Sequence, residues 1–227
     1  MIKLYEEYRD NLPKEELNKV KFGNQTQDLQ RLADDKNDPI LKFFLENGYA
    51  DKIIREAPTN SSDITKNDLQ TLVSMMNAAS PEDITFARQA EEDRAQIFLD
   101  FFKSKRIEET MGKYKEIDNQ SEPLLFYLKD KINRPRPHQL AYYYEIPLYP
   151  LIHTDANSAS YPGGHAMSTF LLGEYYSRKY PMYRGELQLL ANKIAESRNK
   201  MGIHYPSDTE IARKIVQLIW KHNLIKN

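Results

Sequence analysis

Apolar residues recur at helical spacing through most of this chain, while the apolar–polar alternation that marks a strand is rare. Only 8 of the 227 residues are glycine. Such a pattern favours amphipathic helices that each bury one face against their neighbours. The chain is long enough to enclose a substantial core. We therefore predict an all-α fold, a helical bundle.

Helix starts and stops can be read from capping residues and prolines. Ser80 as N-cap, Pro81 at the first position and Asp83 reaching back predict a helix that runs to about residue 105. A helix that begins at Ser121 should end at the Arg-Pro-Arg-Pro segment 134–137, because proline lacks an amide donor and clashes with the preceding turn.

Other segments show the same signals. Helices are expected over 39–47, 63–79, 166–180 and 184–201, the last capped by Gly202, and from a capping box at 207–210 onward. The connection 138–162, rich in Tyr and Pro, is long for a compact domain, and such connections are usually functional or contact partners.

The stretch 57–62 is the best candidate for a domain boundary. We predict an N-terminal helical extension over residues 1–60 and a main domain over 61–227, together one compact unit. The motifs below all fall in the second part, and they do not place the first 60 residues.

Composition limits the chemistry. The net charge of −1 gives no global case for binding nucleic acid or an anionic membrane. The absence of cysteine excludes disulfides, thiolate nucleophiles and cysteine metal sites. Early charges interrupt any signal peptide, and no run approaches the ~20 apolar residues needed to cross a bilayer.

Arg198 continues an apolar helical stripe. Leu187, Ala191 and Ile194 recur at helical spacing, and one further step reaches Arg198. A guanidinium on the face that meets the core needs an anionic partner, because an unpaired buried charge is costly. That partner is either a bound anion or an Asp or Glu in a buried salt bridge.

Lys129 and Arg136 form a second basic group, to which Lys131 and Arg134 add local positive potential. The prolines around Arg136 restrict the freedom that it loses on binding a ligand. The planar guanidinium of arginine suits phosphate, and lysine offers a compact charge. A solvated basic helix end that complements the helix dipole is the alternative.

The segment Tyr161-Pro162-Gly163-Gly164-His165 stands at an expected helix start. Backbone N–H groups and the positive end of the helix dipole attract anions there, and glycine permits close approach. Taken alone, the segment is better interpreted as a glycine-rich turn with a surface histidine.

His204 and Asp208 flank the start of the last helix. An Asp that accepts a hydrogen bond from one ring nitrogen fixes the tautomer and leaves the other nitrogen as a nucleophile or base. A structural His–Asp pair that ties a helix corner is the alternative.

Together these residues form an ordered pattern: Lys129, Arg136-Pro137, then Pro162, Gly164-His165, then Ser197-Arg198, His204 and Asp208. The pattern resembles the three-part signature of the type 2 phosphatidic acid phosphatase superfamily, which includes bacterial class A acid phosphatases and vanadium-dependent haloperoxidases. The length and helical pattern look most like the soluble acid phosphatases. The resemblance implies a helical bundle of the acid phosphatase and vanadium haloperoxidase type, with 61–227 as the phosphatase domain.

The resemblance also implies a role for each residue. Lys129, Arg136 and Arg198 would hold the phosphoryl oxygens, together with the backbone at Gly163 and Gly164.

Three further residues would carry the reaction. His204 would attack phosphorus to form a phosphohistidine, and Asp208 would orient and stabilise His204. His165 would protonate the leaving oxygen and then activate water. The implied activity is metal-independent hydrolysis of phosphomonoesters or diphosphates, with no metal and no cofactor, although phosphate or vanadate can occupy the site.

The chain departs from the family at Gly163, where a serine usually donates a hydrogen bond to the oxyanion. We expect weaker anion binding or slower turnover from its loss, since a hydrogen bond to a charged group is worth ~1.5–3 kcal/mol. Ser158 or Ser160 could supply a substitute hydroxyl.

Two other functions compete with the phosphatase. A vanadate-dependent haloperoxidase could use the same cationic cradle, although such enzymes are typically much longer. A catalytically weakened phosphate-binding homologue would fit Gly163, but it would need neither His165 nor His204. The tyrosines of the connection could stack on an aromatic leaving group, although we favour simple packing.

The expected partner is a small phosphorylated substrate, with no nucleic acid and no transmembrane segment. A homo-oligomer stays open. Because no export signal is visible, we expect a cytoplasmic location, or an unusual host context such as a phage-encoded protein.

Overall fold

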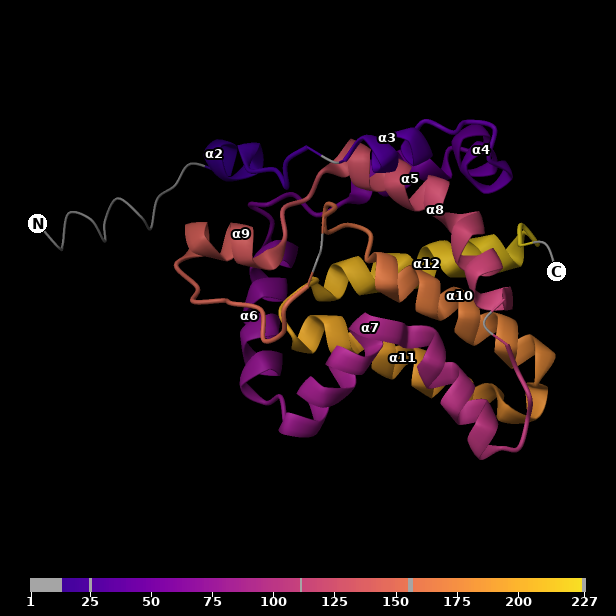
Figure 1. The fold of residues 1–227 in the computed structure, drawn as a ribbon. Coiled ribbons are helices and arrows are strands. Elements are labelled where there is room, and N and C mark those ends of the chain that lie inside the picture. Colours follow the sequence, from indigo (N-terminus) through magenta and orange to yellow (C-terminus); the bar gives the residue numbers. More distant parts are fainter. Residues whose placement is uncertain (1–13, 25, 111, 155–156, 226–227) are drawn as a thin grey trace, which may run out of the picture.

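The computed structural model describes residues 14–24, 26–110, 112–154 and 157–225. Regular structure within these ranges is helical, without strands, which confirms the predicted all-α fold (Figure 1). The α-helices are α2 (Lys14–Lys19), α3 (Gln27–Ala33), α4 (Pro39–Glu46), α5 (Tyr49–Glu56), α6 (Asp63–Asn77), α7 (Pro81–Ser104), α8 (Gly112–Ile132), α9 (Pro137–Ala141), α10 (Gly164–Lys179), α11 (Arg184–Lys200) and α12 (Pro206–Lys221), and the 3-10 helices are η1 (Tyr142–Tyr144) and η2 (Pro181–Tyr183).

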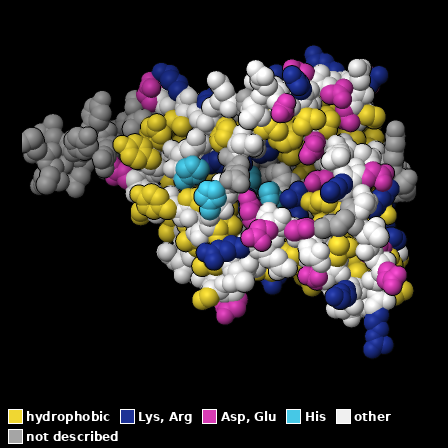
Figure 2. Space-filling model, viewed as in Figure 1, with side chains coloured by type: hydrophobic (Ala, Val, Ile, Leu, Met, Phe, Trp, Pro, Cys, Tyr) yellow, Lys and Arg dark blue, Asp and Glu magenta, His cyan; other side chains and the backbone are white. Residues whose placement is uncertain are grey.

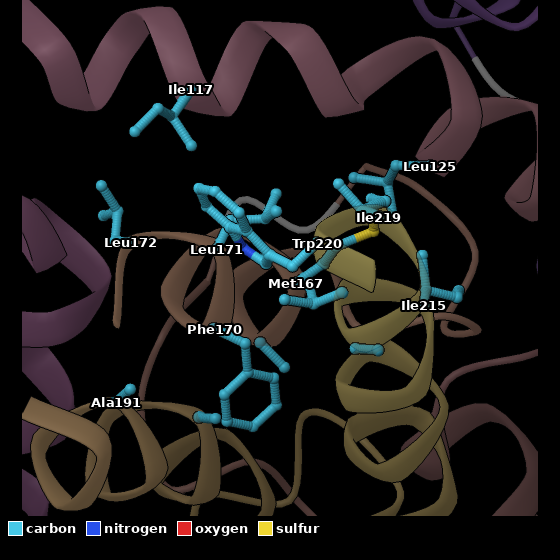
Figure 3. Packing of buried hydrophobic residues seen from close by; sticks show 14 of the residues in the cluster. Ile117, Leu125, Met167, Phe170, Leu171, Leu172, Ala191, Ile215, Ile219 and Trp220 are labelled. Carbon is cyan, nitrogen blue, oxygen red and sulfur yellow. The ribbon is translucent and has the colours of Figure 1, made fainter. Parts of the chain in front are cut away.

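Helix α10 lies at the centre of the molecule and packs on α8, α11 and α12. Figure 3 shows Met167 of α10 in the space between α8, which carries Ile117, and α12, which carries Ile219. Gly173 lets α11 approach closely, because a Cβ there would lie 2.7 Å from the Cβ of Ala191. This packing fixes the relative positions of the helix ends that form the site below.

The N-terminal helices share this core. Ile40 and Phe44 of α4 and Ile53 of α5 are buried in the same apolar cluster as residues of α8, α10 and α12. At the expected boundary, the Asn60 side chain donates to the backbone carbonyl of Leu17 at 2.8 Å. Residues on both sides of position 60 therefore build one hydrophobic interior.

Helix α7 begins as predicted and then bends. The Ser80 hydroxyl accepts from the Asp83 amide at 3.1 Å, and the Asp83 carboxylate accepts from the Ser80 amide at 3.2 Å. The backbone leaves the helical region at Asp93 (φ −155°, ψ 85°), whose carboxylate accepts from the Gln96 amide at 3.0 Å. The bend divides α7 into two segments, and residues on both sides of it, Glu91 and Arg94, line the site described below.

Three helix starts differ from the sequence prediction, and the first is that of α10, which begins at Gly164 rather than at residue 166. Helix α8 begins at Gly112 rather than at Ser121, and it continues through Pro123. Proline costs ~3 kcal/mol inside a helix, but the preceding turns bury Ile117 in the core, and this packing outweighs the cost. Helix α12 begins at Pro206, so the proposed capping box at 207–210 is wrong.

The cap of α12 instead joins Asp208 to Tyr205, whose amide donates to the Asp208 carboxylate at 3.0 Å. The expected cap of α11 is confirmed: Gly202 has φ +72°, and the next amide, of Ile203, donates back to the Arg198 carbonyl at 3.0 Å. The connection 138–162 also holds more structure than expected, since it includes most of α9 and all of η1.

Candidate active site

A cavity of about 330 Å³ lies where α7, α8, α10 and α11 meet the loops before α10 and α12. Basic, acidic and histidine side chains gather around the middle of the face seen in Figure 2. The residues that line the cavity are Glu91, Arg94, Asp118, Glu122, Leu125, Phe126, Lys129, Arg136, Thr154, Asn157, Ser158, Gly164, His165, Arg198 and His204. All three predicted cations and both predicted histidines are among them.

His204 is buried and is held from behind by Asp208. The Nδ1 atom of His204 lies 3.1 Å from the Asp208 Oδ2 atom, which also accepts from the Ser160 hydroxyl at 2.5 Å. The two side chains meet because of the cap of α12: His204 precedes the N-cap residue, and Asp208 lies in the first turn of the helix.

The other ring nitrogen of His204 faces Arg136. The Arg136 Nη1 atom lies 2.9 Å from His204 Nε2. A guanidinium can only donate, so Nε2 carries a lone pair and the ring proton sits on Nδ1, where it donates to Asp208. Burial, followed by the charge of Arg136, holds the pKa of His204 well below its usual range. His204 is therefore neutral, with its lone pair directed into the cationic part of the cavity.

Lys129 and Arg136 are anchored by loop carbonyls. The Lys129 ammonium donates to the Ala159 carbonyl, and Arg136 donates from Nε and Nη2 to the Ser158 carbonyl at 3.0 and 2.8 Å. Burial, and then the neighbouring Arg136, lowers the pKa of Lys129 well below normal. Burial lowers the pKa of Arg136 to about 10. An anion in the cavity would offset the cost of burying these two positive charges.

Arg198, at the end of α11, is the third cation, and only 2% of it is exposed. Its Nη1 atom is paired with the Glu91 carboxylate, while its Nε atom is buried without a hydrogen-bond partner among the described residues. Burial lowers the pKa of Arg198 to about 10. The buried salt bridge that the sequence left open as an alternative is thus present, and Glu91 is its acidic member.

His165 lies in the first turn of α10 and contacts the same Glu91 carboxylate oxygen as Arg198. Its Nε2 atom is 3.4 Å from the Glu91 Oε2 atom. Burial, together with the charges of Arg94, Arg136 and Lys129, lowers the pKa of His165 to about 3. This histidine is therefore neutral near pH 7, and an anion bound beside it would favour its protonated form.

The two glycines occupy different places. Gly164, the first residue of α10, lines the cavity, and its N–H has no partner within the helix. Gly163 does not line the cavity, and its amide donates to the Asp208 carbonyl at 3.1 Å. Gly163 therefore joins the start of α10 to the start of α12.

Ser158 and Ser160, the candidates for a substitute hydroxyl, also lie in different places. Ser160 is committed to Asp208, whereas Ser158 lines the cavity. Thr154, which the sequence did not single out, lines the cavity as well, and its hydroxyl donates to the Glu91 carboxylate at 2.9 Å. It also lies 3.4 Å from Arg198 Nη2.

Sequence reasoning underestimated Arg134. Its side chain is fully buried, and Nη1 donates to Asp208 Oδ1 at 2.7 Å. The guanidinium also lies 3.8 Å from the centre of the Tyr205 ring. Arg134 thus acts beneath the site rather than as surface potential. Its place beside Arg136 in the proline-bounded segment was the signal that could have indicated a role.

The outer part of the cavity carries a second set of charges. Arg94 donates to Asp118 at 2.9 Å, and Glu122 lines the same rim. Burial, and then the charge of Asp118, raises the pKa of Glu122. This rim of the cavity is therefore polar and charged.

The tyrosines of the connection do not line this cavity. Tyr161 is buried, and Tyr144 donates to the Asn60 carbonyl at 2.6 Å, so these two pack as we favoured. Tyr142 and Tyr149 are exposed and lie beside another depression, with His138 and Tyr143.

Comparisons with known proteins show the fold. The chain is similar to the crystal structure of a transmembrane PAP2-type phosphatidylglycerolphosphate phosphatase from Bacillus subtilis, with a TM-score of 0.50 and 16% identity over 84% of this chain and 98% of that one. No family model matches the chain, and neither does any curated protein. In the described part of the chain, none of the helices has the length and apolar character required to cross a membrane. The likeness supports the helical arrangement that the sequence pattern implied.

Proposed function

We propose that this protein is a metal-independent phosphoester hydrolase of the type 2 phosphatidic acid phosphatase superfamily, closest to the soluble acid phosphatases, acting on phosphomonoesters or diphosphates. One observation carries the proposal: His204 is held at Nδ1 by Asp208 and directs the lone pair of Nε2 into a cavity lined by Lys129, Arg136 and Arg198. An imidazole prepared in this way beside three cations suits attack on a phosphoryl group.

The first half-reaction forms a phosphohistidine. The phosphoryl oxygens lie against the three cations and the Gly164 amide. Binding of the phosphoryl group moves the Arg136 guanidinium away from His204 Nε2. Nε2 then attacks phosphorus, a P–N bond forms and the bond to the leaving oxygen breaks. Asp208 stabilises the imidazolium that develops, as the acidic member of such a pair does.

His165 serves both halves of the reaction. Its Nε2 atom lies 3.4 Å from Glu91, the carboxylate that pairs with Arg198, and we assign this nitrogen to the leaving oxygen. The bound dianion favours protonation of His165, which donates this proton to the leaving oxygen. His165 then accepts a proton from the attacking water as the P–N bond breaks, and inorganic phosphate is released.

The decisive test is hydrolysis of an aryl phosphate in the presence of a chelator. We expect activity that ignores the chelator and that falls by at least about 10⁴-fold in His204→Ala, the scale seen when a covalent nucleophile is removed. His138→Ala is the matched control, because this histidine is exposed outside the cavity. Activity that persists in His204→Ala, or that requires a metal, would refute the proposal.

The same preparation tests the competing functions. Vanadate should inhibit hydrolysis by occupying the cradle. Halide oxidation upon addition of vanadate, peroxide and bromide would instead indicate a haloperoxidase. Binding of phosphate without any hydrolysis would indicate a phosphate-binding homologue.

A further inference from the structure

One carboxylate occupies the part of the cavity where a phosphoryl group is expected. Glu91, on the first segment of α7, accepts from Arg198 Nη1 and from the Thr154 hydroxyl at 2.9 Å, and its Oε2 atom is 3.4 Å from His165 Nε2. A single carboxylate oxygen therefore contacts both the third cation and the candidate proton donor.

Glu91 and a bound phosphoryl group compete for the same donors. The proposed function assigns Arg198 to the phosphoryl oxygens and His165 to the leaving oxygen, and both already contact Glu91 Oε2. A dianion beside an ionised carboxylate is strongly repelled in a partly dehydrated site. The two anions cannot share these donors, so one must leave.

Arg198 is the one of the three predicted cations that is paired with a carboxylate. Lys129 is satisfied by the Ala159 carbonyl, and Arg136 by the Ser158 carbonyl and His204. Arg198 is buried and fixed, and an unpaired guanidinium there would be costly.

Glu91 is the more exposed member of the pair. Its side chain is 22% exposed, against 2% for Arg198, so the carboxylate can turn to water while the guanidinium stays. The bend at Asp93 lies just beyond it, so the segment that carries Glu91 is not continuous with the rest of α7. The Nε atom of Arg198 is buried without a hydrogen-bond partner among the described residues, so the pairing with Glu91 leaves part of the guanidinium unsatisfied.

We propose that Glu91 is an internal competitor, whose carboxylate pairs with Arg198 at the oxyanion site and is displaced when a phosphoryl group binds. The proposal rests on the proposed function, because it takes the phosphoryl group to bind at Arg198. Glu91 would then help to determine which anions bind, since an incoming anion must interact with Arg198 more strongly than the Glu91 carboxylate does.

The test compares Glu91→Gln with Glu92→Gln. The glutamine keeps the size and polarity of residue 91 without the charge, and Glu92 is the exposed neighbour on the same helix. Calorimetric titration of each variant with inorganic phosphate should show about tenfold tighter binding for Glu91→Gln, equivalent to ~1.4 kcal/mol. With an aryl phosphate, KM should fall in Glu91→Gln, and Glu92→Gln should match the wild type in both measurements.

Three outcomes would overturn the proposal. Phosphate affinity that is unchanged or weaker in Glu91→Gln would show that the carboxylate does not compete. A fall in kcat with unchanged KM would show instead that Glu91 positions His165. If Glu91→Gln is unstable, added phosphate should raise its melting temperature more than that of the wild type, and an equal rise would also refute competition.

The binding measurement keeps this proposal separate from the proposed function. Tighter phosphate binding by Glu91→Gln, with no hydrolysis by either protein, would support competition and refute the hydrolase. Hydrolysis that depends on His204, with no effect of Glu91→Gln on phosphate affinity, would support the hydrolase and refute competition.

Discussion

The Arg134 guanidinium donates from Nη1 to Asp208 Oδ1 at 2.7 Å, and neither side chain has any exposure to solvent. Burial alone would raise the pKa of Asp208, but Arg134, with help from His204, holds it well below its usual value. The carboxylate therefore stays ionised and keeps accepting from His204. This ion pair connects the fold to the orientation of the proposed nucleophile.

Replacing Arg134 by methionine should affect stability and activity together. The change leaves Asp208 as an uncompensated buried charge, which costs about 3–5 kcal/mol, and it frees Asp208 from its main partner. Urea denaturation should show the loss of stability, and kcat should fall even at temperatures where the variant is folded. Lys131→Met, at an exposed position of the same helix end, should change neither quantity. A fully stable Arg134→Met would contradict this account.

Ser160→Ala should slow turnover without abolishing it. The hydroxyl donates to Asp208 Oδ2 at 2.5 Å, the same oxygen that receives His204 Nδ1. Loss of a hydrogen bond to a charged group costs about 1.5–3 kcal/mol, which should appear in the melting temperature and in kcat. KM should change little, because Ser160 does not line the cavity. A large rise in KM with normal kcat would place the hydroxyl on the substrate instead.

Gly163→Ser should strengthen phosphate binding. The backbone there (φ −70°, ψ 111°) suits any residue, and a Cβ would meet the Asp208 carbonyl oxygen at 3.4 Å, so the side chain can be accommodated. If the added hydroxyl reaches the oxyanion, affinity should rise about tenfold, within the range for a hydrogen bond to a charged group. Gly163→Ala supplies the Cβ alone and is the matched control. Equal affinities for the serine and alanine variants would show that the hydroxyl does not act on the anion.

Binding of an anion should draw a proton into the site. His165 has its pKa lowered to about 3 in the free protein, chiefly by burial and next by Arg94. A dianion nearby raises this pKa. At a pH between the His165 pKa without the anion and the pKa with it, the complex therefore carries more protons than the separate protein and anion. Affinity for sulfate, which itself stays dianionic, should therefore increase as the pH falls.

Calorimetry in buffers of different ionisation enthalpy measures this uptake directly. The wild type should take up a proton on binding sulfate near pH 6, and His165→Gln should take up less. Binding heats that do not depend on the buffer would show that His165 stays neutral, and would remove it as the proton donor.

Much of the fold and of the cavity could be predicted from sequence because the relevant signals are local. Caps and prolines marked the ends of α7, α10 and α11, and the predicted cations and histidines lie at or near such ends. The start of α8 was misplaced because Pro123 imitates a first turn, whereas the burial of Ile117, a tertiary effect, extends the helix.

The partners of these residues could not be predicted, because they come from distant parts of the chain. Glu91 meets Arg198 across 107 positions, and Arg134 meets Asp208 across 74. The sequence indicated that Arg198 needs an anion but gave no means of choosing the acidic residue. Such pairs depend on how α7 and α8 pack on the last three helices, which periodicity does not encode.

The rim of the cavity has a consequence for how this fold can diversify. Arg94, Asp118 and Glu122 project from the middle of helices, while His204 and Asp208 belong to the start of α12. Exchanging rim side chains leaves the caps and the core intact. A descendant of this chain could therefore accept a substrate with a different leaving group through substitutions at the rim alone, and keep the proposed catalytic residues unchanged.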